Sequence, residues 1–413
     1  MKILFLFCDM LRPDKLVSGS PVLELMGKMG GTWFREAYTP AAETPRALAC
    51  MYTGLYPKRN GCRKRGQWPY YFLDTGCDNL FRLLKRHDFR TLYYASPYSF
   101  SPKEGIVPRD FDSCGEIFFD YGEITETVKK DSSENLCVWL GYDDYHDAVD
   151  HYSCGPVVSR EVADKVGQEH LAAAIEKFIG AVGNKFDRII LFSDHGCLLE
   201  NDKNSEYIGK TRTNITLFVH RKGDKGINEI KKSVSLMDIF PTVAEWLGEK
   251  PDTDGISLED LNTGRMVAME DIYHYKGVDQ FLYSTYNLWA VKTDDYYYIE
   301  HLDGKNNGDQ AHPADSFRSI LEEKCCFYKE NRYGWDIINL KERSVGNELI
   351  FKVDKPFGEK YNNSGRRIKY TDGSGFNKTA SMKISRKLGD IRYQLQRISS
   401  VLGKELKELR NLF

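Results

Sequence analysis

Three apolar runs of this chain are each followed by an aspartate. They are residues 2–8 before Asp9, residues 187–193 before Asp194, and residues 136–142, beyond which Asp147 lies. Strongly apolar runs of this length are typical of strands buried on both faces, as in parallel sheets covered by helices. Ligands bind outside the carboxyl ends of such strands, so polar residues at these positions are well placed for function.

Strand-like and helix-like segments alternate along the chain. Helical periodicity is found at residues 79–86, 171–182 and 234–247, and further strand-like runs at residues 90–94 and 216–220. This alternation predicts an α/β fold with a mostly parallel central sheet and helices on both of its faces. Runs at residues 288–291 and 296–299 predict a smaller, antiparallel C-terminal sheet.

A polar stretch at residues 250–255, rich in Pro, Asp and Gly, marks a boundary. We therefore predict a catalytic α/β domain at 1–260, a smaller α+β subdomain at 261–350 and a tail at 351–413. In the tail, apolar residues from Ile384 to Leu409 recur at three- and four-residue steps, which predicts a terminal amphipathic helix with a basic polar face. Such a helix contacts an anionic membrane surface, mediates homo-oligomer formation or packs on its own domain.

The overall charge excludes some partners. The chain has 58 basic and 60 acidic residues, so no strong field favours nucleic acid. The ten cysteines lack zinc-ribbon spacings and are interpreted as reduced thiols. The first apolar run lacks a cleavage site, and no run of about 18 apolar residues follows. We expect a cytoplasmic protein, with membrane association through the tail as the alternative.

Histidines accompany two of the three aspartates. His195 follows Asp194 directly, and His151 follows Asp147 by four residues, which would place this pair on one side of a helical turn. Aspartate and histidine are suitable ligands for Zn²⁺ or a related divalent ion. Each pair also has a simpler interpretation, since aspartates form turns or cap helices and the segment around Asp147 is polar enough to be a solvated loop.

A hydroxyl lies ahead of a Thr-Gly turn in residues 43–57, ETPRALACMYTGLYP. Thr44 and Pro45 suit the N-cap and first position of a helix. Because a helix N-terminus also binds anions, this interpretation is compatible with a catalytic role for Thr44.

Together these segments resemble the alkaline phosphatase superfamily, most closely its sulfatase-like and nucleotide pyrophosphatase/phosphodiesterase branches. The resemblance rests on the spacing from Thr44 to Gly54, on residues 142–151 and 193–196, and on residues 234–242 and 289–299, and it covers roughly residues 1–300. It implies two divalent metal ions, with Zn²⁺ favoured and Mn²⁺ as the alternative. The implied ligands of the first ion are Asp9, Thr44, Asp194 and His195, and those of the second are Asp147 and His151.

The chain departs from the family pattern at the second ion. The segment that supplies a third histidine is missing, and the replacements to consider are His220, His274 and His301. Lys210, in the sequence GKTRTN, resembles a lysine that contacts the substrate anion, although a solvated basic loop explains it equally well.

Residue 44 distinguishes between two chemistries. Sulfatases of this superfamily modify a Cys or Ser within a Cys/Ser-x-Pro-x-Arg pattern, whereas this chain has Thr44 and, in place of the arginine, Leu48. The resemblance therefore implies a phosphodiesterase or phospho-group transferase that forms a phosphothreonine, acting on a glycan-linked, lipid-linked or nucleotide-type phosphate ester. The alternatives are a sulfatase or phosphomonoesterase of the same superfamily and an inactive binding module.

Overall fold

The computed structural model describes residues 1–62, 73, 76–94, 115–154, 159–197, 199, 208–261, 265–276, 283–293, 297–300, 323–325, 359–361 and 367–369. The chain divides into two compact units: Met1–His274 with Ser284–Gly346, and Tyr275–Tyr283 with Asn347–Phe413. The domain boundaries inferred from the sequence stay predictions. The amphipathic segment of the tail lies outside the described residues.

Within the described residues, the first unit contains an eight-stranded sheet in the order β10-β2-β9-β7-β1-β6-β4-β5. Its strands are β1 (Lys2–Cys8), β2 (Gly31–Phe34), β4 (Arg90–Tyr94), β5 (Gly115–Phe118), β6 (Leu136–Tyr142), β7 (Arg188–Phe192), β9 (Leu217–Arg221) and β10 (Ile227–Ile230). The strands from β7 to β5 are parallel, and β10 is parallel to β2. Only β9 runs antiparallel to its neighbours, β7 and β2. The predicted mostly parallel sheet is confirmed.

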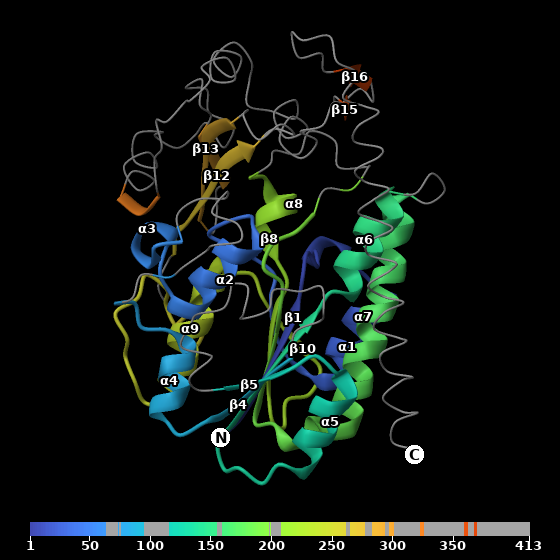
Figure 1. Ribbon diagram of the computed structural model, residues 1–413, viewed down its shortest axis with the longest axis vertical. Coiled ribbons are helices and arrows are strands. Elements are labelled where there is room, and N and C mark those ends of the chain that lie inside the picture. Colours follow the sequence, from blue (N-terminus) through green and yellow to red (C-terminus); the bar gives the residue numbers. More distant parts are fainter. Residues whose placement is uncertain are drawn as a thin grey trace, which may run out of the picture. The chain divides into compact units, whose positions relative to one another are not determined.

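Helices cover both faces of this sheet (Figure 1). One face carries α2 (Thr44–Thr53), α4 (Leu80–Arg86) and α9 (Ile239–Trp246); the other carries α1 (Pro21–Met29), α5 (Tyr121–Lys130), α6 (Asp144–Cys154) and α7 (Arg160–Val182). Side chains of β1 alternate between two hydrophobic cores, with Phe5 in the first and Leu6 in the second. This two-sided burial explains why the strand is apolar along its whole length.

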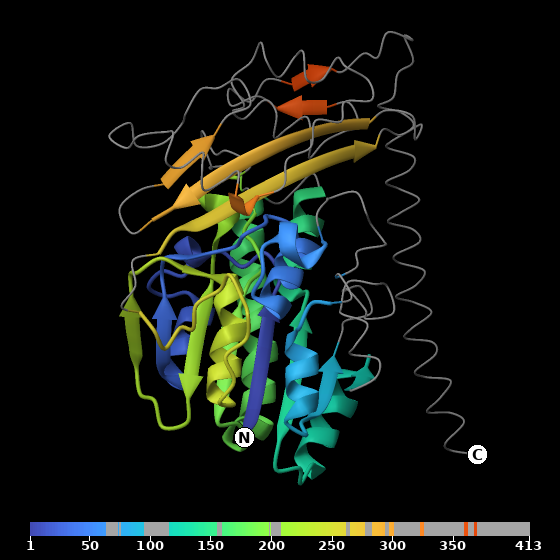
Figure 2. The same cartoon turned by 90° about the vertical axis from the view of Figure 1, so that its left-hand side faces the viewer.

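Smaller elements complete the described chain. A three-stranded sheet contains β3 (Ala37–Tyr38), β8 (Asn214–Ile215) and β11 (Val234–Ser235), and the short helices are α3 (Pro57–Asn60) and α8 (Lys210–Thr213). A second three-stranded sheet contains β12 (Val267–Lys276), β13 (Tyr283–Lys292) and β14 (Tyr297–Glu300), of which β12 and β13 lie side by side in Figure 2. β13 and β14 are antiparallel, so the predicted C-terminal pairing is confirmed. In the second unit, β15 (Glu359–Tyr361) pairs with β16 (Arg367–Lys369).

Two predicted helices have different limits in the structure. The α-helix predicted at 234–247 begins only at Ile239, because Val234 and Ser235 belong to β11 and a 3-10 turn at Leu236–Asp238 follows them. A capping box begins this turn, and in it the Ser235 amide donates to the Asp238 carboxylate. The helix predicted at 171–182 begins earlier, at Arg160, where the Ser159 side chain caps it. Among the helices that the structure describes, none has the length and apolar character of a membrane span.

Candidate active site

The parallel strands deliver three aspartates to one edge of the central sheet. β1 lies between β6 and β7, and the registers of these two pairs, continued past the strand ends, place Asp9 level with Asp143 and Asp194. Asp143 directly follows β6 just as Asp9 directly follows β1. Sequence reasoning assigned Asp143 to a solvated loop, and its position relative to the apolar run is the signal that could have identified it.

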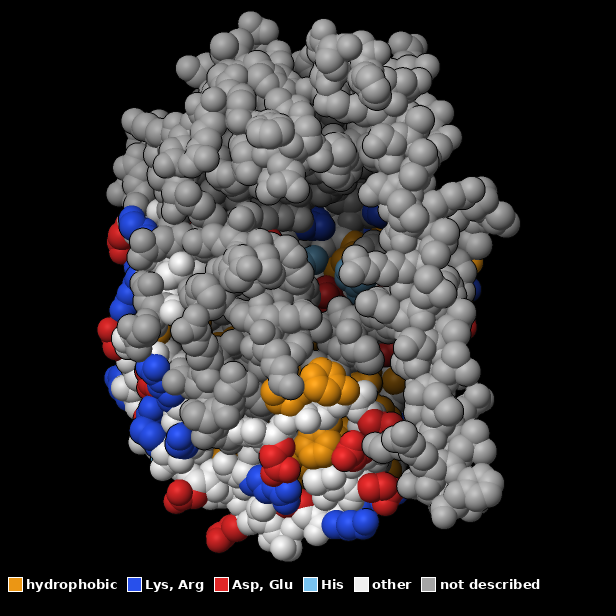
Figure 3. Space-filling model, in the orientation of Figure 1, with side chains coloured by type: hydrophobic (Ala, Val, Ile, Leu, Met, Phe, Trp, Pro, Cys, Tyr) orange, Lys and Arg blue, Asp and Glu red, His pale blue; other side chains and the backbone are white. Residues whose placement is uncertain are grey.

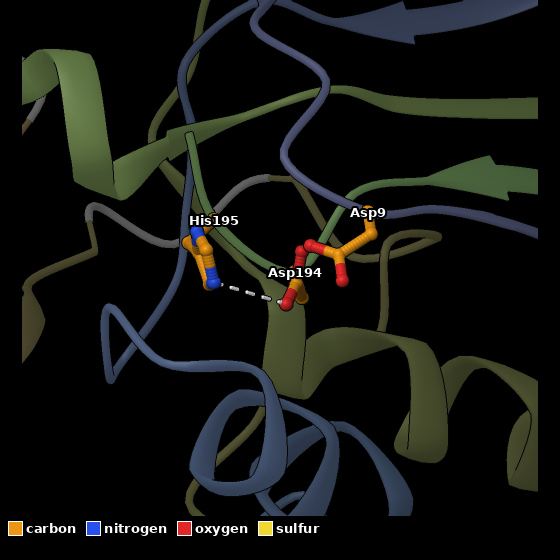
Figure 4. A group of neighbouring side chains, drawn as sticks. All are labelled: Asp9, Asp194 and His195. Carbon is orange, nitrogen blue, oxygen red and sulfur yellow. Dashed lines mark ion pairs between the residues drawn. The ribbon is translucent and has the colours of Figure 1, made fainter. Parts of the chain in front are cut away.

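Asp9, Asp194 and His195 form a compact group that we call the Asp-Asp-His cluster (Figure 4). Each offers one ligand atom, and these atoms all lie within 4.8 Å of one another. The backbone amide of Met10 donates to Asp194 Oδ1 across 3.2 Å, and Met10 itself has a φ of 64°, a left-handed conformation that costs energy for a residue with a side chain. The chain thus turns sharply after Asp9 and holds the neighbouring aspartate in place.

The hydrogen bonds of His195 define its tautomer. Nδ1 lies 2.8 Å from the carbonyl oxygen of Gly196, and because a carbonyl only accepts, Nδ1 carries the proton. Nε2 therefore presents its lone pair, as it does in histidines that bind metals. Nε2 is 3.3 Å from Asp194 Oδ2 and 3.2 Å from Thr44 Oγ1, and in the tautomer with the proton on Nδ1 it accepts the hydrogen bond of the Thr44 hydroxyl.

Thr44 reaches the cluster from the first turn of α2. The structure assigns the N-cap to Glu43 and makes Thr44 the first helical residue, so the helix begins one residue earlier than predicted. Backbone N–H groups contribute less at this turn than expected, because Pro45 has none and the amide of Ala47 donates to the carbonyl of Glu43. The Thr44 hydroxyl is the group that α2 contributes to the cluster.

The donor set fits a divalent cation such as Zn²⁺. Asp9, Thr44, Asp194 and His195 are each no more than 6 % exposed. Among the described residues, no hydrogen-bond donor reaches Asp9 Oδ1 or Asp194 Oδ2, and such buried acceptors are costly without a partner. His195 Nε2, Asp194 Oδ2 and Thr44 Oγ1 are close enough together that one ion could bind all three.

The electrostatics of the cluster point to the same conclusion. Burial, and then the negative charge of Asp194, raise the pKa of Asp9 well above its usual value. His146 acts in the opposite direction and lowers this pKa, while Asp143 raises it. A cation held between Asp9 and Asp194 would remove the repulsion between their carboxylates.

The short helix α8 packs against both segments that form the site. A guanidinium nitrogen of Arg212 donates to the carbonyl of Ala42 across 2.8 Å, and the amide of Gly196 donates to the carbonyl of Arg212 across 2.8 Å. Lys210 is exposed on the first turn of this helix. Contact of Lys210 with a substrate anion stays a prediction. Acidic, histidine and basic side chains are visible near the middle of the face in Figure 3.

The close packing of α8 predicts that Gly196→Ala will disrupt the site. A Cβ at residue 196 would lie 2.1 Å from the carbonyl oxygen of Thr211, which is backbone and cannot rotate away. We expect a loss of about 2–4 kcal/mol in the free energy of unfolding, measured by urea denaturation. The matched control is Gly180→Ala in α7, where a Cβ meets nothing within 4 Å and a gain of up to about 1 kcal/mol is expected. Equal stability of the two variants would contradict this packing.

The second predicted metal site is only partly described. Asp147 and His151 both lie on α6, as the predicted helical turn requires. The Asp147 side chain is 37 % exposed, and its Oδ1 is 3.9 Å from Nδ1 of His146. The side chain of His151 lies outside the described part of the chain. The second ion and its two ligands stay predictions.

Of the replacements considered for the third histidine, His220 is wrong. It lies on β9 opposite Ile189, near the start of β7, and its Nδ1 contacts the carbonyl of Gly30 at 2.9 Å. Asp194 comes five residues after Ile189, so His220 lies about 17 Å from the Asp-Asp-His cluster along the strand direction. His301 and the side chain of His274 lie outside the described residues.

The fold is shared with solved hydrolase structures of low sequence identity. A 2-O GAG sulfatase has a TM-score of 0.57 at 12 % identity, and the match covers 78 % of this chain and 89 % of that one. Phosphonate monoester hydrolases from Silicibacter pomeroyi and Agrobacterium radiobacter have TM-scores of 0.53 and 0.50, both at 14 % identity, and each match covers 90 % of this chain and 100 % of the hydrolase. Comparison of the sequence with family models and with curated proteins finds no match.

The chain therefore shares its fold with these sulfatases and phosphonate monoester hydrolases, and the predicted alkaline-phosphatase-like α/β fold is confirmed. At the carboxyl ends of the strands, where open α/β sheets bind ligands, the structure brings together Asp9, Thr44 and the adjacent pair Asp194 and His195, from three segments far apart in sequence.

Proposed function

We propose that the protein is a metal-dependent hydrolase or group transferase of phosphate esters, with Thr44 as its nucleophile. The observation that carries this proposal is the 3.2 Å contact between Thr44 Oγ1 and His195 Nε2 at the edge of the Asp-Asp-His cluster. A threonine hydroxyl next to a single histidine is a weak nucleophile. A divalent cation bound by these four residues would lower the pKa of the Thr44 hydroxyl and neutralise charge on the reacting group.

The chemistry of this chain's own residues follows in two steps. The Thr44 hydroxyl releases its proton to solvent, and Oγ1 attacks phosphorus. The bond from phosphorus to the leaving oxygen breaks, the leaving group departs and takes up a proton from solvent, and phosphorus stays bonded to Thr44 as a phosphothreonine. A second nucleophile then attacks this phosphorus and restores the Thr44 hydroxyl. Water as the second nucleophile makes the protein a hydrolase, and an alcohol makes it a transferase.

Diester-like substrates are favoured for this site. A phosphonate monoester, the substrate class named for two of the structural neighbours, has a single ionised oxygen at phosphorus, as a phosphodiester has. A sulfate ester is the second candidate because sulfatases are also among the neighbours. Against it stands the side chain at residue 44, since threonine cannot give the aldehyde that sulfatases of this fold use. A glycan- or lipid-linked phosphate ester remains our proposal for the wider substrate.

The test compares four aryl esters with the same leaving group: a phosphodiester, a phosphonate monoester, a phosphomonoester and a sulfate. With protein loaded with Zn²⁺ or Mn²⁺, we expect kcat/KM to be at least about tenfold higher for the first two than for the others. Protein treated with a chelator and returned to metal-free buffer is the control, and it should be inactive on all four. Faster turnover of the sulfate than of every phosphorus ester would contradict the proposal and favour a sulfatase.

A further inference from the structure

A buried ion pair joins the helix of the proposed nucleophile to the small C-terminal sheet. The guanidinium of Arg46, in the first turn of α2, pairs with the carboxylate of Glu270 in β12, and both residues are 0 % exposed. Burying two charges completely is expensive, and such a pair adds little stability compared with apolar residues of the same size. Its presence directly beside Thr44 calls for a reason other than stability.

The position of Arg46 is unfavourable by itself. The N-terminus of a helix carries a partial positive charge, so an arginine in the first turn is repelled there. Glu270 supplies the compensating negative charge from outside the helix. Residues two apart on a helix point about 200° away from each other. Thr44 therefore faces His195 on one side of the first turn while Arg46 faces Glu270 on the other.

Glu270 is itself firmly held. Its amide donates to the carbonyl of Pro40 across 2.8 Å, and it forms an isolated β-bridge with Ala41, three residues before Thr44. Two residues earlier in β12, the amide of Ala268 donates to the hydroxyl of Tyr56, which follows α2 in the sequence. β12 therefore contacts the chain both before and after α2, and the ion pair of Glu270 with Arg46 adds a contact to α2 itself.

We infer that Glu270 is a positioning residue which, through Arg46, fixes the rotation of the first turn of α2 and so aims Thr44 Oγ1 at the Asp-Asp-His cluster. This inference rests on the proposed function for the role of Thr44, but it makes a separate statement about metal affinity. If Thr44 is a ligand aimed by this pair, breaking the pair weakens metal binding only when Thr44 is present.

The test is a double-mutant cycle on the full chain, read out as the Zn²⁺ dissociation constant from competition with a chromogenic chelator. We expect Glu270→Gln to raise this constant about tenfold, and to leave it unchanged in a Thr44→Ala background. The same rise in both backgrounds, no rise in either, or a Thr44→Ala variant with unchanged affinity would each overturn the inference. Because no substrate is used, an absence of ester turnover would count against the proposed function alone.

The matched control is Glu36→Gln. Glu36 Oε2 lies 3.3 Å from the Nζ of Lys292 in β13, so it also joins the small sheet to the body of the unit, but away from α2. We expect its Zn²⁺ affinity to equal that of the unaltered protein. Should Glu270→Gln fail to fold, the double substitution Arg46→Met with Glu270→Met removes both charges and is expected to fold. An unaltered Zn²⁺ affinity in that folded variant would likewise overturn the inference.

Discussion

Thr44→Ala is expected to abolish ester cleavage, with a fall in kcat of about 10⁴-fold or more, because it removes the atom that attacks phosphorus. Alanine is smaller than threonine and favours a helix, so the fold should survive the substitution in the first turn of α2. The measurement is kcat with metal-loaded protein on the best of the four aryl esters. In parallel, protein quenched during turnover is digested and the peptide containing residue 44 is examined by mass spectrometry for a phosphoryl group.

Thr44→Ser is the matched control because it keeps a hydroxyl in the same place. The serine side chain has more rotational freedom than threonine, so we expect activity within about tenfold of the unaltered protein. The serine variant should also give the phosphorylated peptide, and the alanine variant should not. Ester turnover that persists in Thr44→Ala would show that water, and not this side chain, attacks the substrate.

The central strands could be predicted because their burial determines their composition. β1, β6 and β7 are covered by helices on both faces, so their apolar runs are unbroken and their ends are clear in the sequence. The two-residue strands β3 and β8 have no such signal, since backbone pairing with distant segments defines them. The predicted start of the helix at 234–247 was wrong because Val234 pairs with the distant Ala37 in a sheet, and the local sequence does not show this pairing.

The part of the site that lies at the carboxyl ends of the parallel strands could be predicted from the sequence. Asp9, Asp194 and His195 follow apolar runs directly, and parallel pairing alone brings them together. Glu270 could not be found this way, because 224 residues separate it from Arg46 and nothing in the local sequence relates the two. Contacts of this length depend on tertiary packing of the small sheet, which a pattern of residues does not encode locally.

The Asp-Asp-His cluster predicts opposite effects of one substitution with and without metal. Without metal, Asp9→Asn removes the like charge beside Asp194, so we expect the free energy of unfolding to rise by about 1 kcal/mol. With saturating Zn²⁺, the unaltered protein gains stability from binding and the variant loses most of that gain, so their order reverses. Melting temperatures in chelator and in Zn²⁺ test this, with Asp252→Asn as the control because the Asp252 side chain is 88 % exposed and belongs to neither proposed metal site. A lower melting temperature of Asp9→Asn in both buffers would mean that Asp9 stabilises the fold and not a cation.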